Sequence, residues 1–102
     1  EEEGERCAAQ FSDPSKKVMI MGNHGVMIIG SSVADTFNRL YYFERAAETY
    51  IRALQTGQKL RVLSHEIAEK AAREMDDYPA QADQHLSELK AILDSEGSDY
   101  AD

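Results

Sequence analysis

Two short apolar runs around a tight loop constrain this chain more than any other part of its sequence. Residues 18–22 read Val-Met-Ile-Met-Gly, residues 23–25 read Asn-His-Gly, and residues 26–30 read Val-Met-Ile-Ile-Gly. Asn and Gly tolerate the positive φ angles of tight turns, so the pattern predicts a β-hairpin. Because neither run alternates apolar with polar residues, both faces of the hairpin are expected to be covered, as in a multi-stranded sheet with helices on both sides. Most of that sheet is missing from the 102 residues.

Apolar residues three and four positions apart predict helices over most of the remaining chain. The expected helices are the tail of one within residues 1–11, a long one from about Val33 to Thr56, one that follows Ser64, and a last one that begins around Pro79. Ser32 is expected to cap the long helix together with Asp35, and Gly57 to end it. The stripe of the long helix that is expected to face the core consists of Phe37, Leu40, Phe43, Ala47, Tyr50, Ile51 and Leu54. One hairpin and about four helices place the chain in the α/β class.

Charge and cysteine content argue against several classes of function. The formal net charge is −8, which opposes nucleic acids and anionic membranes because both attract surfaces rich in Lys and Arg. Cys7 is the single cysteine, so the sequence holds no internal disulfide, and a reducing, cytoplasmic location is expected. No apolar stretch of the sequence is long enough to span a membrane. The chain starts with acidic residues and without Met, so we expect a cleaved or truncated product of a longer protein.

His24 is the side chain in this sequence that is most suited to a chemical role. The hairpin turn fixes its backbone, so the imidazole is aimed in one direction, as a metal ligand must be because divalent metals tolerate little error in ligand position. The simpler interpretation is that Asn23, His24 and Gly25 form only a turn. Taken without any family comparison, the residues favour the simpler interpretation, because no partner ligands are in view.

Three other polar side chains have weaker claims to a chemical role. His65 begins a near miss to the zinc-protease pattern His-Glu-x-x-His, but Glu69 stands where the second His belongs, so His65 is expected at the surface. His85 lies beside the apolar stripe of the last helix and is interpreted as structural. Glu44 falls inside the apolar arc of the long helix, where a carboxylate has to be paired. A structural hydrogen bond is the simpler role for Glu44, and a bond that orients the His24 turn is the alternative.

Part of the chain resembles a known protein family. The residues that carry the resemblance are Met21-Gly22-Asn23-His24-Gly25-Val26-Met27-Ile28-Ile29-Gly30, Ser31-Ser32-Val33-Ala34 and Leu40-Tyr41-Tyr42-Phe43-Glu44-Arg45-Ala46. They are similar to the C-terminal half of the class II aldolase/adducin family, in which a strand, an Asn-His-Gly turn, a second strand ending in Gly and a long helix follow one another. The resemblance is clear over Val18–Leu54, loose over residues 1–17 and general in the last two helices, and the ending resembles bacterial members of uncharacterised activity.

The resemblance implies that residues 1–102 are the C-terminal portion of a single three-layer α/β/α domain whose N-terminal portion is absent. In catalytic members the His of this turn is the third zinc ligand, which implies that His24 binds a divalent metal, zinc in the first place. Asn23, Gly25 and Glu44 are then its expected supports. The other two His ligands and an acidic catalytic residue lie upstream in those members. No catalytic residue is therefore implied here, and the chain is expected to be inactive alone.

The intact protein is expected to be a lyase of the aldolase type, or an epimerase or dehydratase, that acts on a small sugar or sugar phosphate. Family members are often tetramers, so a homo-oligomer is expected. The alternative is a non-catalytic, adducin-like interaction module. An upstream His-x-His pair with an acidic residue would favour the enzyme, and its absence would favour the module. The substrate, the reaction subtype, the metal and the oligomer number stay open at this point.

Overall fold

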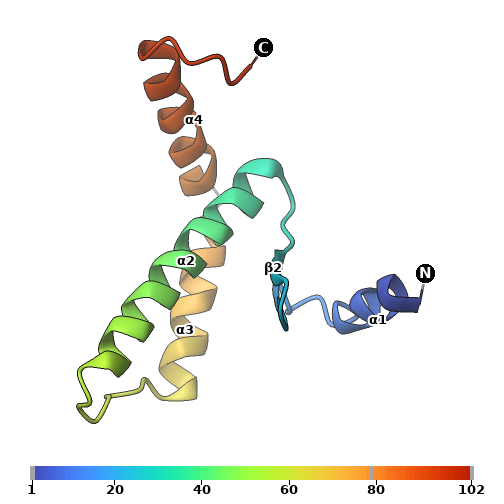
Figure 1. Cartoon of the computed structure of the whole chain (residues 1–102), viewed down its shortest axis with the longest axis vertical. Coiled ribbons are helices and arrows are strands. Elements are labelled where there is room, and N and C mark those ends of the chain that lie inside the picture. Colours follow the sequence, from blue (N-terminus) through green and yellow to red (C-terminus); the bar gives the residue numbers. More distant parts are fainter. Residues whose placement is uncertain (1, 79, 102) are drawn as a thin grey trace.

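The computed structural model describes residues 2–78 and 80–101. The last helix was expected to begin around Pro79, which lies outside the described residues. The elements in chain order are helix α1 (Glu2–Gln10), strands β1 (Val18–Met21) and β2 (Gly25–Ile28), and helices α2 (Val33–Gln55), α3 (His65–Asp76) and α4 (Ala80–Ser95). The two strands form an antiparallel hairpin that leads into α2, and α4 lies across the N-terminal half of α2 (Figure 1). The mixed α/β class, with one hairpin and four helices in the described residues, is confirmed. The three-layer arrangement stays a prediction.

The hairpin forms where the sequence predicts, but its loop is shifted by one residue. Met21 pairs with Gly25, so the loop consists of Gly22, Asn23 and His24. Asn23 has a φ of 65°, a left-handed conformation that Asn tolerates better than most residues. Gly25 has a φ of 126°, which side chains rarely permit. The His24 N–H donates to the Met21 carbonyl at 3.3 Å and closes the turn, so the backbone at the tip is fixed.

Both faces of the hairpin carry apolar side chains that remain accessible. Val18 and Ile20, which share one face because they lie two residues apart, are 38% and 74% exposed. Met27 lies on the other face, opposite Met19, and is 37% exposed. The described residues therefore leave both faces of the hairpin uncovered, although continuous apolar strands are normally covered on both faces. The strands and helices expected to cover this hairpin stay a prediction.

Helix α2 begins and ends where the sequence predicts. Ser32 has an extended backbone, and its Oγ accepts a hydrogen bond from the Asp35 N–H at 3.1 Å, which makes Ser32 the N-cap. The carboxylate of Asp35 accepts from the N–H of Ser31, one residue before the position that a standard capping box uses. Thr56 follows the last helical residue, and Gly57, with a φ of 67°, turns the chain away from the helix axis.

The pairing of α2 with α4 is the main helix contact in the described chain. Ala34 on α2 and Ala82 on α4 are each only 7% exposed, and small residues allow two helices to approach closely. One turn further along α4, the His85 ring lies edge-on to the Tyr41 ring, with centroids 4.6 Å apart. The Nδ1 atom of His85 lies 2.9 Å from Asn38 Oδ1. His85 is therefore a packing residue between the two helices, as the sequence predicts.

The apolar stripe predicted for α2 is only partly covered. Three residues of the stripe are half-buried: Phe37, Phe43 and Ala47. The other four have exposed fractions between 40% and 58%: Leu40, Tyr50, Ile51 and Leu54. The physical reason is that α4 contacts α2 on the face that carries Asn38 and Tyr41. Leu40 lies on another face of the helix, and Tyr50, Ile51 and Leu54 lie beyond this contact. Helix α3 is uncovered as well, with Ile67 and Met75 exposed by 55% and 49%.

None of the helices in the described residues is both long and apolar enough to cross a membrane.

Candidate functional site

His24 lies at the tip of the hairpin with its side chain exposed to solvent. An exposed neutral imidazole is a good ligand for divalent metals. Within residues 2–78 and 80–101, however, no group of three or more His, Cys, Asp or Glu side chains is placed to hold a metal. A catalytic zinc site takes about three protein ligands and one open position. The residues described here therefore fit the role of a single ligand and not of a complete metal centre.

Two of the three residues predicted to support His24 belong to the turn itself. Asn23 and Gly25 flank His24 and hold the positive φ angles that shape the tip. Glu44 is exposed on α2 beside Ala47, and its carboxylate forms no hydrogen bond with another residue of the described ranges. The expectation that Glu44 is paired is wrong for these ranges, because the residue is exposed and an exposed carboxylate needs no protein partner. A role for Glu44 at the His24 turn of the intact protein stays a prediction.

His65 is a surface residue, as the sequence predicts. It lies in the first turn of α3, its side chain is 89% exposed, and its Nε2 lies 4.0 Å from an oxygen of Glu69. Ser64 caps the helix just before it, with its Oγ accepting from the Ile67 N–H at 3.4 Å. The near match to a zinc-protease pattern therefore corresponds to an exposed helix start.

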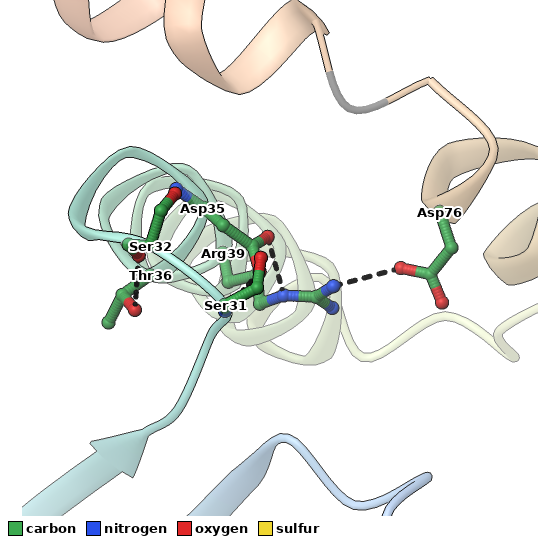
Figure 2. A network of polar contacts seen from close by, with 6 residues as sticks. All are labelled: Ser31, Ser32, Asp35, Thr36, Arg39 and Asp76. Carbon is green, nitrogen blue, oxygen red and sulfur yellow. Dashed lines mark hydrogen bonds and ion pairs between the residues drawn. The ribbon is translucent and has the colours of Figure 1, made fainter.

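A cluster of polar contacts fixes the base of the hairpin to the first turn of α2 (Figure 2). Ser31 donates from its N–H and its hydroxyl to Oδ2 of Asp35, at 2.9 and 3.1 Å. Thr36 donates from its N–H and its hydroxyl to the Ser32 carbonyl, both at 2.9 Å. Gly30 leads into this cluster and leaves no room for a side chain, because a Cβ there would lie 2.6 Å from Thr36 Oγ1 and 2.9 Å from Asp35 Oδ2. The chain that leaves β2 therefore lies directly against the start of the helix.

Arg39 extends these contacts to α3. Its Nε donates to Asp35 Oδ1 at 2.8 Å and its Nη2 donates to Asp76 Oδ1 at 3.0 Å, so one guanidinium bridges two carboxylates (Figure 2). The side chains of Arg39 and Asp35 are 27% and 23% exposed, whereas that of Asp76 is 58% exposed. Because water and salt screen exposed pairs more strongly, the bond to Asp35 is the stronger half of the bridge. We call the residues of Figure 2 the junction cluster: Ser31, Ser32, Asp35, Thr36, Arg39 and Asp76.

The pKa of Asp35 is lowered by its surroundings. Partial burial on its own raises the pKa, but the N–H and hydroxyl of Ser31 and the guanidinium of Arg39 favour the charged carboxylate and together outweigh burial. Asp35 is therefore ionised at neutral pH. Its bonds to Ser31 and Arg39 are charge-assisted, a class of hydrogen bond that is roughly twice as strong as neutral ones.

A hollow of about 550 Å³ opens beside the junction cluster. Lys17 and Arg39 bring positive charge to its lining, and Asp35, Asp76 and Asp83 bring negative charge. Tyr42 and Gln81 form part of its wall, with the Gln81 amide donating to the Tyr42 hydroxyl at 3.0 Å. The lining mixes both signs of charge, and it holds no set of metal ligands among the described residues. It therefore points to no particular ligand.

The junction cluster is the part of the site that sequence reasoning missed. The sequence marks Asp35 as a cap residue, and its i,i+4 spacing to Arg39 is the one local signal for an ion pair. Asp76 lies 37 residues beyond Arg39, and no local pattern connects the two.

Comparisons with known proteins match the first half of the chain to a protein family. Residues 1–51, which are half of the 102-residue chain, match the family model described as Class II Aldolase and Adducin N-terminal domain. A protein of Caulobacter vibrioides, provisionally described as an aldolase class 2 protein, is 31% identical over 72 residues, which cover 71% of this chain and 27% of that protein. The chain thus spans about a quarter of the length of this curated relative. No solved structure matches the chain.

Proposed function

This chain belongs to the class II aldolase and adducin family, and on this premise we propose that it is part of a divalent-metal-dependent lyase of the aldolase type. The observation that carries the proposal is the exposed His24 at the tip of a hairpin that lies inside the family match, where a hydrogen bond closes the turn and fixes its backbone. The proposed substrate class is a small sugar or a sugar phosphate, as family membership suggests. The chain alone, with its single candidate ligand, is proposed to be inactive.

His24 is proposed as one metal ligand, with zinc as the first candidate metal. It contributes a ring nitrogen from a turn whose backbone Asn23 and Gly25 shape. The remaining ligands and a catalytic acid or base come, in this proposal, from parts of the protein outside the 102 residues. A bound divalent metal supplies Lewis-acid polarisation of the carbonyl and hydroxyl oxygens of a substrate. The contribution of this chain is to hold one donor nitrogen in a fixed place.

We also propose that residues 1–102 are the C-terminal portion of one three-layer α/β/α domain. The accessible apolar side chains on both faces of the hairpin and along the second half of α2 support this, because large exposed apolar surfaces normally have a partner. A two-stranded sheet is marginal in water by itself, so further strands beside β1 and β2 would stabilise it. A homo-oligomer in the cytoplasm is part of the same proposal.

A non-catalytic, adducin-like interaction module is the second candidate function. One observation favours it: apolar side chains on both faces of the hairpin and on the second half of α2 are exposed in the described residues. In that case the exposed apolar surface would serve the binding of a protein partner. A His-x-His pair and an acidic residue in the rest of the protein would decide for the enzyme.

Assays for cleavage of carbon–carbon bonds in the full-length protein test the proposal. A panel of small sugars and sugar phosphates is incubated with the protein, and the cleaved, epimerised and dehydrated products are quantified with and without a metal chelator. We expect cleavage of at least one compound, loss of cleavage with the chelator, and recovery on addition of Zn²⁺. If a folded, Zn²⁺-supplied protein neither cleaves, epimerises nor dehydrates any of the compounds, the interaction module is the better candidate.

A further inference from the structure

We propose that Asp35 and Arg39 are positioning residues that hold His24 in place from the base of the hairpin. The inference rests on the proposed role of His24 as a metal ligand. Both residues lie on α2, outside the turn that carries His24. Their effect on the tip is therefore mechanical and is transmitted through the hairpin.

Backbone hydrogen bonds make the hairpin a rigid unit. Its ladder ends at the Met21–Gly25 pair next to the tip. Toward the base, the ladder is extended by the Ile29 N–H, which donates to the Lys17 carbonyl at 3.0 Å. Backbone hydrogen bonds thus hold the hairpin at both ends, and the turn around His24 is closed as well. A displacement of His24 relative to α2 therefore requires rotation about the base of the hairpin.

The length of the hairpin amplifies any rotation at its base. His24 lies six residues before Gly30, and at about 3.3 Å per residue the tip is roughly 15–20 Å from the base. A rotation of about 10° would displace the imidazole by about 3 Å over that length. Metal–ligand distances tolerate deviations on the order of 0.2 Å. The angle between the hairpin and α2 is therefore critical for a metal ligand at the tip.

The junction cluster fixes that angle. Asp35 Oδ2 accepts two hydrogen bonds from Ser31, which lies three residues beyond the end of β2. Arg39 holds the other oxygen of the same carboxylate at 2.8 Å and keeps it from rotating away from Ser31. The bond from Arg39 to Asp76 adds an anchor on α3. Removal of the guanidinium is expected to loosen the carboxylate, release Ser31 and allow the hairpin to rotate.

The first test measures the position of the tip in the full-length protein without any metal. Spin labels are attached at His24→Cys and at Gln55→Cys, at the far end of α2, in a background without other cysteines. Pulsed electron paramagnetic resonance then gives the distance between the two labels. We expect a single narrow distribution in this background, and a broader or shifted distribution after Arg39→Gln or Asp35→Asn.

Arg52→Gln is the matched control for this measurement. Arg52 lies on the same helix and forms the same type of i,i+4 pair, with Glu48, but the two side chains are 75% and 51% exposed and lie outside the junction cluster. The distance distribution is expected to stay unchanged in this variant. Circular dichroism confirms that each variant is folded. If Arg39→Gln does not fold, Asp35→Asn carries the test, because it preserves the shape of the side chain.

The second test measures metal binding in full-length protein that keeps His24. Arg39→Gln is expected to weaken the affinity for Zn²⁺ by about 10- to 100-fold, as changes in residues that orient metal ligands do. The visible absorption spectrum of the Co²⁺-substituted protein, which reports ligand geometry, is expected to change as well. Arg52→Gln is expected to change neither quantity.

The outcomes separate this inference from the proposed function. Unchanged distance distributions in both Arg39→Gln and Asp35→Asn would overturn the inference, even if His24 proves to be a metal ligand. Unchanged Zn²⁺ affinity and an unchanged Co²⁺ spectrum in Arg39→Gln would overturn it too. A wild-type protein that binds no divalent metal would overturn the proposed function, whereas the metal-free distance measurement would still decide between a fixed and a loosened hairpin.

Discussion

Arg39 Nη2 donates a hydrogen bond to Asp76 Oδ1 at 3.0 Å, which joins the first half of α2 to the last residue of α3, 37 positions further along the chain. Because Arg39 also holds Asp35 at 2.8 Å, one guanidinium links the base of the hairpin to the end of another helix. The hairpin carries His24 at its tip. The part of the structure that presents the candidate metal ligand is therefore fixed by residues far from the turn itself.

A Gly30→Ala substitution is expected to destabilise the protein by about 1–3 kcal/mol, because it overpacks the base of the hairpin. The new methyl group would lie 2.8 Å from the backbone nitrogen of Thr36, which belongs to the first turn of α2 and has little freedom to move. Urea unfolding of the full-length protein measures the loss. Gly4→Ala is the matched control, since a Cβ there meets nothing within 4 Å. Equal stabilities of the two variants would contradict the close approach at Gly30.

Local signals in the sequence were sufficient to predict the elements around the site. Ser32 and Gly57 mark the ends of α2, and Ser64 marks the start of α3, because capping depends only on neighbouring residues. The hairpin was predictable for the same reason. Its loop lies one residue earlier than predicted, because Gly22 and Gly25 can both border a tight turn and the register depends on strand pairing.

Contacts between distant segments could not be predicted in this way. Leu40 and Ile51 look as suited to a core as Phe37, but α4 contacts Phe37, whereas Leu40 lies on another face of α2 and Ile51 lies further along the helix than the contact. The pairing of Arg39 with Asp76 depends on where α3 ends in space, which no local pattern specifies. The sequence therefore predicts the residue at the tip of the hairpin but not the residues that hold its base.

The stability of the protein at acidic pH is expected to depend on Asp35. Its pKa is lowered in the folded protein, relative to an ordinary Asp value of about 3.9. The contribution of Asp35 to stability is therefore complete above about pH 4 and is lost as the pH falls through the lowered pKa of the folded state. Urea unfolding of the wild type and of Asp35→Asn from neutral pH to about pH 2 measures this, and the difference between them should shrink below about pH 4. A difference that stays constant over the whole range would refute the role of the charged carboxylate.

His85→Ala is expected to destabilise the protein by about 1–2 kcal/mol, because it removes ring contacts and a hydrogen bond between α2 and α4. The ring centroid of His85 lies 4.6 Å from that of Tyr41 and 5.5 Å from that of Phe37, and Asn38 would lose its partner. Thermal unfolding provides the measurement. His65→Ala, at a side chain that is 89% exposed, should change stability by less than about 0.5 kcal/mol. Similar losses in the two variants would argue against the packing role of His85.

The central claim is that the hairpin presents His24 as a ligand to a divalent metal. The most direct measurement is the metal content of purified, full-length His24→Ala, compared by elemental analysis with the wild type and with His65→Ala, a change at an exposed histidine on α3. We predict that the wild type and His65→Ala retain the same stoichiometric amount of metal, and that His24→Ala loses most of it while its circular dichroism spectrum is unchanged. Full metal content in a folded His24→Ala variant would contradict the claim.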